Sequence, residues 1–309
     1  MKSSNIGGQA VLEGVMMRNG ADYAVAVRKQ DGDIEVMKDT YSSVIKIKAL
    51  TKTPFVRGVF NFIDSMVLGM KTLNFSASFY EEEETKGKVL TEKEVARKEK
   101  IDNLLTTITM IVSFIIAIGI FMVLPYFIVG IIEAKLPNSF ITVLLEGIVR
   151  IGIFIGYILL VSQMNDIKRT FMYHGAEHKC INCVEHGLPL TVENVKISSK
   201  EHKRCGTSFI FFVLIISIIC LFFIQVDTWW MRVLVRILML PFIAGISYEL
   251  IKWAGNSENC VIGALSRPGL WMQALTTKEP DEDMIEVAIA SVEAIFDWEA
   301  YIKELEHDA

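Results

Sequence analysis

The apolar run Ile108–Ile132 constrains the fold more than any other feature of this sequence, because it contains no charged side chain. A helix of about 20 such residues spans the ~30 Å hydrocarbon core of a bilayer. Pro125 lies inside the run and predicts a local kink, since proline lacks the N–H of an interior helical residue. The run therefore predicts a transmembrane helix.

Three further apolar stretches follow, at Ser139–Gln163, Thr207–Val226 and Met231–Ala254. Together with the first run they predict four spans arranged as two helical hairpins. The 52% hydrophobic composition of the 309 residues agrees with this, because it exceeds that of ordinary soluble domains. The expected fold class is mainly α: a polytopic membrane protein with about four transmembrane helices.

Charged residues interrupt the second and fourth spans. Glu146 and Arg150 are four residues apart, so they can pair on one face of a helix that is turned towards the bundle. Arg232 and Arg236 lie in the fourth span, where Arg232 can extend to the membrane surface. Glu249 lies near the end of the same span.

Basic residues predict the orientation of the spans. The linkers after the first and third spans hold one basic residue, Lys135, whereas the segment between the second and third spans holds seven: Lys168, Arg169, Lys179, Lys196, Lys200, Lys203 and Arg204. Short loops rich in lysine and arginine stay in the cytoplasm. We therefore expect a multi-pass protein of the cell membrane with both termini cytoplasmic.

The segments before the membrane domain differ in character. Residues 1–53 predict a small β-rich cytoplasmic unit, with a β-hairpin whose turn is formed by Asp31-Gly32. Residues 54–105 predict an amphipathic helix in the membrane interface, followed by a charged linker. The helix carries three charges, which disfavour a spanning position.

Residues 106–254 are expected to form the four-span membrane domain, including a cytoplasmic segment at 164–206. Residues 255–309 predict a cytoplasmic tail with a loop and one amphipathic helix, with Pro280 in its first turn. The net charge of −5 and the lack of a basic block argue against a nucleic-acid partner. Five cysteines without a secretory signal indicate reduced thiols or metal ligands.

A cluster of metal-binding residue types lies between Tyr173 and Phe209, which hold four of the five histidines and three of the five cysteines. His174 and His178 are four residues apart, so both imidazoles leave one face of a helix and can meet one ion. Glu177 lies beside them as a candidate base. His-x-x-Glu-His is the inverted form of the zincin motif, and it predicts a divalent metal site, with zinc as the expected ion.

Three alternatives stay open for these residues. The histidines can simply face water in a polar loop. Cys180 and Cys183 form a C-x-x-C sequence that also occurs in redox pairs. His178, Cys180, Cys183 and His186 can together form a closed structural site without chemistry.

Several strings resemble the YqhQ-like bacterial membrane proteins, a family of unknown function that is described as candidate metal-dependent enzymes. They are GGQAVLEGVMMR at 7–18, YHGAEHK at 173–179, HKRCGTSF at 202–209, YEL at 248–250 and LTTKEPD at 275–281. The resemblance runs along nearly the whole chain. The resemblance implies that the following residues of this chain correspond to the family's pattern: Gly7, Gly8, Gln9, Glu13, Gly14, Arg18, His174, Glu177, His178, Cys183, Glu185, His202, Arg204, Cys205, Tyr248 and Glu249.

Two departures from the family pattern affect the interpretation. Lys203 stands where proline is usual, which changes the expected local turn. Cys180 and His186 are outside the pattern, and this disfavours the closed structural site.

The sequence thus favours a metal-dependent membrane hydrolase. His174 and His178 are expected ligands, Glu249 or His202 the third, and Glu177 the base that acts on a metal-activated water. Besides the bilayer itself, the expected partner is a lipid headgroup or a membrane peptide as substrate; the sequence does not choose between them, and it does not indicate an oligomeric state. The rival hypothesis is a transporter, channel or scaffold with a structural metal, in which Glu146, Arg150 and Arg236 are the functional residues.

The orientation is testable with single cysteines placed at Asn138, Thr228 and Lys196. Cysteines at Asn138 and Thr228 should react with a membrane-impermeant thiol reagent added to intact cells, because both positions lie in linkers expected outside. A cysteine at Lys196 should react only after the membrane is opened. Labelling at Lys196 but not at Asn138 in intact cells would contradict the orientation.

Overall fold

Four strands near the N-terminus form one antiparallel sheet in sequential order: β1 (Ile6–Val11), β2 (Gly14–Asn19), β3 (Asp22–Arg28) and β4 (Ile34–Thr40). The predicted hairpin is confirmed as the β3–β4 pair, and Gly32 in its turn has a φ of +94°, which favours glycine. The β-rich unit is larger than the single predicted hairpin, because β1 and β2 pair in register from Ile6–Asn19 to Val11–Gly14.

The computed structural model describes residues 3–44, 53–80, 92–133, 139–224, 226, 228–255 and 260–308. The chain divides into two units. The first comprises residues 1–80, 158–216 and 239–309, and the second comprises 81–157 and 217–238. Residues 81–91 of the predicted charged linker and residues 134–138 between the first two spans lie outside the described part.

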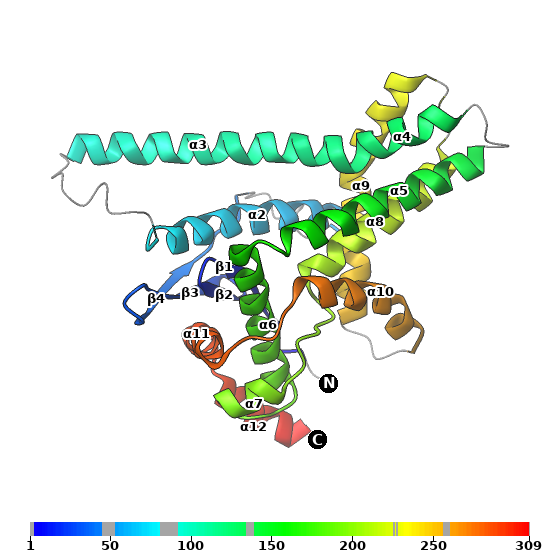
Figure 1. The fold of residues 1–309 in the computed structure, drawn as a ribbon. Helices are drawn as coiled ribbons and strands as arrows, with labels where there is room; N and C mark the ends of the chain where they lie inside the picture. Colours follow the sequence, from blue (N-terminus) through cyan, green and yellow to red (C-terminus); the bar gives the residue numbers. More distant parts are fainter. Residues whose placement is uncertain are drawn as a thin grey trace. The chain divides into compact units, whose positions relative to one another are not determined.

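In the first unit the sheet is covered on both faces, since successive residues of a strand point to opposite sides. Val15 and Met17 share a core with helices α6 (Asn165–Glu185) and α11 (Glu282–Glu293). Met16 shares a second core with Leu68 of helix α2 (Val56–Ala77). Figure 1 shows α2 on one side of the sheet and α6 with α11 on the other. The sheet therefore separates α2 from α6.

Helix α2 turns its small and polar residues inward. Gly58, Asp64, Gly69, Thr72 and Ser76 are buried together with Leu68. Large apolar side chains of the same helix are exposed, namely Val56, Phe62, Ile63 and Leu73. This pattern is the reverse of that of a helix on a soluble domain.

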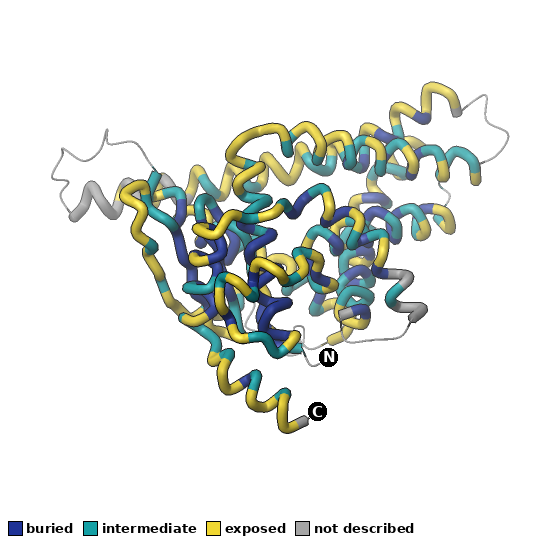
Figure 2. The backbone as a smooth tube through the Cα atoms, turned by 60° about the horizontal axis from the view of Figure 1, so that its bottom comes forward, coloured by how far each residue is buried: buried dark blue, intermediate teal, exposed yellow. Residues whose placement is uncertain are grey.

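The prediction of four candidate membrane spans is confirmed. Four helical stretches are long and apolar enough to cross a bilayer: Leu104–Ile132, Phe140–Val161, Gly206–Phe223 and Trp229–Ala254. They belong to α3 (Glu92–Ile118), α4 (Leu124–Glu133), α5 (Ser139–Val161), α8 (Gly206–Phe223) and α9 (Trp229–Gly255). Figure 2 shows long exposed stretches along these apolar helices, whereas buried residues concentrate in the sheet and its covering helices.

A π-helical turn, η2 (Gly119–Val123), lies between α3 and α4, and Pro125 is the second residue of α4. Proline has no N–H to donate and its ring meets the carbonyl four residues earlier. A wider turn relieves that contact. The structure thus has a π-turn close to Pro125, the proline for which the sequence predicts a kink.

In the second unit, Glu146 of α5 lies between two arginines. Arg150 Nη2 donates to Glu146 Oε1 at 2.7 Å, and Arg236 Nη2 of α9 donates to Oε2 at 2.5 Å. Arg150 also donates to the Ser217 hydroxyl at 2.8 Å. The predicted Glu146–Arg150 pair is confirmed, and the structure adds Arg236 as a second partner. All three charged side chains are at most 9% exposed.

The C-terminal region contains more helix than the sequence predicted. It forms α10 (Cys260–Thr276), α11 and α12 (Trp298–Asp308) rather than a loop and one amphipathic helix. Pro268 lies inside α10, although proline disfavours the interior of a helix. Helix α11 begins after Asp281, whose carboxylate caps the Met284 N–H at 2.9 Å, so Pro280 precedes the helix instead of lying in its first turn.

The arginine pair around Glu146 predicts an order of stabilities. Glu146→Gln should destabilise the protein by about 3–5 kcal/mol, because it leaves two buried guanidinium groups without a counter-charge. Arg150→Met should cost less, since Glu146 keeps Arg236. Thermal unfolding of the detergent-purified variants measures this order. The combined change Glu146→Gln, Arg150→Met and Arg236→Met should recover part of the loss, and a triple variant as unstable as Glu146→Gln would contradict the explanation.

Candidate metal centre

Helix α6 carries His174, Glu177 and His178, and its second half is surrounded by protein. Every residue from Gly175 to Glu185 is buried, as is Tyr173. Strands β1 and β2 cover one side, and α11, α12 and α7 (Val192–Ile197) cover others. The motif therefore does not lie in a solvated polar loop. Its polar side chains need partners within the protein, because an unpaired buried polar group is costly.

Several of these partners are backbone carbonyls at the end of α7 and in the segment that follows it. Lys179 Nζ donates to two of them and Asn182 Nδ2 to two more, all within residues 196–201 and at 2.7–2.9 Å. His178 Nδ1 contacts a further carbonyl of this segment, that of Lys200, at 2.7 Å. The buried face of α6 thereby fixes the chain that leads to Cys205.

The same kind of contact orients both histidines of the motif. His174 Nδ1 lies 3.0 Å from the Thr276 carbonyl oxygen, and His178 Nδ1 contacts that of Lys200. A carbonyl oxygen only accepts, so Nδ1 carries the proton in each ring and Nε2 is left as the ligand atom. The two ring centroids are 4.4 Å apart.

Cys205 completes a group of three metal-binding side chains. Its Sγ lies 3.3 Å from His174 Nε2, and it accepts the Thr207 N–H at 3.4 Å. The ligand atoms of His174, His178 and Cys205 all lie within 4.8 Å of one another. In a tetrahedral zinc site with bonds of about 2.0–2.3 Å, two ligand atoms lie roughly 3.3–3.8 Å apart. The donor set therefore suits a zinc ion, and the side chains would move together by up to about 1 Å to hold it.

Glu177 lies next to this group, beneath the first strand. It is 4% exposed, and burial raises its pKa to about 7, although the electrostatic interaction with His174 and a hydrogen bond from the Gly8 backbone act in the opposite direction. A Cβ atom on Gly8 would lie 2.8 Å from Glu177 Cγ and 2.7 Å from the Met16 carbonyl oxygen. Glycine at position 8 thus lets β1 lie directly on the carboxyl group.

His202 lies close to the group but has a different partner. Its Nε2 is 3.5 Å from Glu185 Oε2, and its ring centroid is 5.7 Å from that of His178. Burial lowers the pKa of His202, which favours the neutral ring. Burial would raise the pKa of Glu185, but His202, the charge of Arg204 and Ser4 outweigh it and lower that pKa to about 2.

Glu249 is held elsewhere in the first unit. Its carboxylate accepts hydrogen bonds from the Arg57 guanidinium and, at 3.2 Å, from the Phe55 N–H. The structure therefore brings together His174 and His178 but not Glu249, and it offers Cys205 as the third donor. The sequence suggested Glu249 as a ligand because its expected depth in the membrane is close to that of the histidines. Depth alone does not identify the side chain with which an acidic residue pairs.

The residues of the alternative closed site do not converge on one point. Cys180 is fully buried in the hydrophobic core, and Cys183 donates to the carbonyls of Leu188 and Pro189 at 3.6 and 3.5 Å. His186 Nδ1 contacts the Asn182 carbonyl at 2.7 Å. Among the described residues, the only group of three or more metal-binding side chains contains neither cysteine of the C-x-x-C sequence.

The three donors face a cavity of about 290 Å³. Glu177, His202 and Arg204 also line it, together with Gly7 and Gly8 of β1. Arg204 is engaged by Glu185 and Ser3, so its charge is already balanced. A small polar group can thus reach the ligand atoms and the Glu177 carboxyl group from one space.

Sequence reasoning did not select Cys205 as a ligand, although the cysteine belongs to the same stretch as the histidines. The available signal was its distance of three residues from His202. That spacing suggests a shared site with His202 and gives no indication of the contact with His174. Glu13, one of the residues of the family pattern, binds Arg169 of α6 and accepts the Tyr173 hydroxyl at 3.2 Å. It therefore anchors β1 and β2 to α6.

Comparison with known proteins gives a family but no described activity. Residues 53–298 match the family described as "Protein of unknown function (DUF1385)". The chain is 35% identical over 295 residues to the "Uncharacterized protein YqhQ" of Bacillus subtilis (strain 168), covering 95% of this chain and 93% of that protein. No solved structure matches the chain.

The two glycines of β1 provide a matched pair of variants. Gly8→Ala should destabilise the protein by about 1–3 kcal/mol, because its Cβ would overlap the Met16 carbonyl and Glu177. Gly7→Ala should be nearly silent, since nothing lies within 4 Å of a Cβ at that position. Thermal unfolding of both variants tests this difference. Equal stabilities would contradict the close packing of β1 on Glu177.

Proposed function

Because this chain belongs to the DUF1385 family, whose function is unknown, we propose a function from its geometry: a metal-dependent hydrolase of the membrane with a zinc ion at His174, His178 and Cys205. The observation that carries the proposal is the convergence of two imidazole nitrogens and one thiol within 4.8 Å, beside a buried carboxyl group. Imidazole and thiolate are preferred zinc ligands.

A zinc ion held there would supply Lewis acidity, which makes a water molecule more acidic and polarises a substrate bond. Three protein ligands leave a position free for water or substrate. Glu177 would accept the proton of the attacking water on its carboxylate and later transfer it to the leaving group. The Gly8 N–H would hold that carboxylate in place, and the Thr276 and Lys200 carbonyls would fix the two imidazoles.

The location that we propose for this centre is the cytoplasmic face of the cell membrane. The support is the excess of basic residues between the second and third spans, together with four candidate spans in the chain. Both termini lie on the same side in this arrangement. The substrate is then a molecule that the enzyme meets at the membrane surface.

The non-enzymatic alternative, a scaffold with a structural metal, is less well supported. A closed structural site has four protein ligands, whereas the described residues offer three. A second catalytic candidate rests on the 3.3 Å between Cys205 Sγ and His174 Nε2, which is the spacing of a cysteine nucleophile and its base. The metal content of the purified protein separates these two chemistries.

Variants at the centre separate a base from a ligand. Glu177→Gln keeps the size of the side chain but removes its basicity, so metal content and thermal stability should stay near those of the parent. Catalysis should fall by roughly 10²–10⁴-fold, and complementation of a strain that lacks the native protein should fail. Elemental analysis of detergent-purified protein and growth of the strain measure the two properties.

His178→Ala and Cys205→Ser should instead lose the metal, whereas Cys183→Ser is the matched control. A serine at 183 can still donate to the Leu188 and Pro189 carbonyls, so this variant should keep both metal and function. A Glu177→Gln variant that loses its metal as completely as His178→Ala would make Glu177 a ligand. A parent protein without metal that is inactivated by a thiol reagent at Cys205 would favour the cysteine nucleophile.

A further inference from the structure

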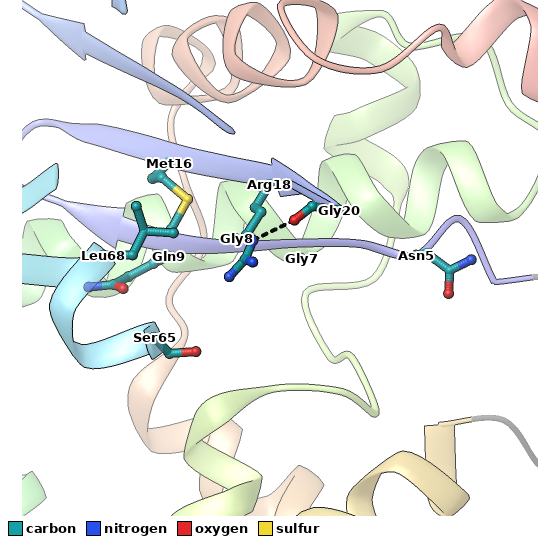
Figure 3. Close-up of a pocket in the computed structure, with 9 residues that line it drawn as sticks. All are labelled: Asn5, Gly7, Gly8, Gln9, Met16, Arg18, Gly20, Ser65 and Leu68. Carbon is teal, nitrogen blue, oxygen red and sulfur yellow. Dashed lines mark hydrogen bonds between the residues drawn. The ribbon is translucent and has the colours of Figure 1, made fainter. Parts of the chain in front are cut away.

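A second cavity, of about 360 Å³, lies on the other face of the sheet, between β1, β2 and α2. Its polar lining comes from Asn5, Gln9, Arg18 and Ser65, with Gly7 and Gly8. Figure 3 shows the Arg18 and Gln9 side chains extending towards the side on which Ser65 of α2 lies. Arg18 is the only charged residue among those that line the cavity.

The charge of Arg18 has no acidic partner in the described part of the chain. Its Nε donates to the Gly20 carbonyl at 2.7 Å, and its guanidinium lies 5.3 Å from the centre of the Tyr41 ring. The Asp64 carboxylate of α2 accepts instead from the Tyr41 hydroxyl and the Val44 N–H, both at 3.1 Å. The remaining guanidinium N–H groups are therefore available to an anionic ligand.

This cavity and the one at the metal centre share a wall. Asn5, Gly7 and Gly8 line both. They lie at or next to β1, which is an edge strand of the sheet, so the two spaces approach each other around its free edge. A Cβ on Gly7 would meet nothing within 4 Å, so the space beside that residue is open. A ligand anchored at Arg18 can thus extend towards His174 and Glu177.

The outer face of α2 indicates where such a ligand comes from. The helix lines the cavity with Ser65 and Leu68 while it exposes Phe62, Ile63 and Leu73. In a chain with four candidate spans, an apolar face of this kind suits contact with lipid. A bilayer against that face would place the cavity close to lipid headgroups.

We propose that this second cavity binds the phosphate of an anionic phospholipid headgroup, with Arg18 as its counter-charge, and presents the headgroup to the metal centre along Gly7 and Gly8. The proposal rests on the hydrolase proposed above and names its substrate class. Phosphate suits the site because arginine binds it through several N–H groups at once. The acyl chains remain in the bilayer beside α2.

The test measures headgroup binding separately from metal. Full-length protein in zwitterionic nanodiscs is titrated with glycerol 3-phosphate and with inorganic phosphate, and thermal stabilisation is recorded before and after chelation. A second arm replaces part of the zwitterionic lipid with phosphatidylglycerol and counts retained lipids by native mass spectrometry. Glycerol 3-phosphate should stabilise the parent with and without metal, and phosphatidylglycerol should be retained. His178→Ala should keep this binding even though it loses metal.

Two variants and one control decide the outcome. Arg18→Gln should weaken glycerol 3-phosphate binding roughly 10-fold to 100-fold, as expected when a charge-assisted hydrogen bond is lost. Gly7→Leu should weaken it as well, because the leucine side chain would fill the open space beside Gly7 without backbone strain. Lys71→Gln removes an equal charge from α2, but Lys71 is paired with Asp39 at 2.9 Å and should bind like the parent.

Binding that is unchanged in Arg18→Gln and Gly7→Leu would overturn the site. Equal weakening in Lys71→Gln would show general surface attraction and would also overturn it. Binding of inorganic phosphate without any retention of phosphatidylglycerol would overturn the lipid assignment. No stabilisation of the parent by either phosphate compound would likewise overturn the proposal.

Discussion

The burial of the second half of α6 is the constraint on which the rest of the first unit depends. This half is polar, yet it lies between the sheet and the C-terminal helices, so each polar side chain must find a partner inside the protein. Lys179, Asn182 and His178 find theirs on the backbone of residues 196–201. These hydrogen bonds fix the chain just before Cys205 and so place Cys205 against His174. The contacts that satisfy the buried polar groups therefore also assemble the metal-binding side chains.

The sheet contributes through its small residues and its edge. Gly8 allows β1 to lie on Glu177, and Gly7 leaves the edge of the strand open. The same strand thus closes the metal centre on one face and lines the Arg18 cavity on the other. Glu13 lies in the turn between β1 and β2, and its contacts with Arg169 and Tyr173 hold that turn against α6.

In the second unit, buried charged side chains likewise need partners inside the protein. Glu146 is shared by Arg150 and Arg236, because a guanidinium group in an apolar bundle requires a counter-charge. The spacing of Glu146 and Arg150 on one helix made their pairing predictable. Arg236 comes from another span, so its share in the pair depends on how α5 and α9 pack.

The sequence by itself determined the features that depend on local composition and spacing. These are the four apolar spans, the β3–β4 hairpin, the Glu146–Arg150 pair and the two histidines on one face of α6, since each follows from neighbours along the chain. The tertiary structure decided which distant residues meet. It placed Cys205 at the histidines and paired Glu249 with Arg57, and it joined residues 1–80, 158–216 and 239–309 in one unit. The physical reason is that burial forces each polar group to a partner, and only the packed chain determines which partner is within reach.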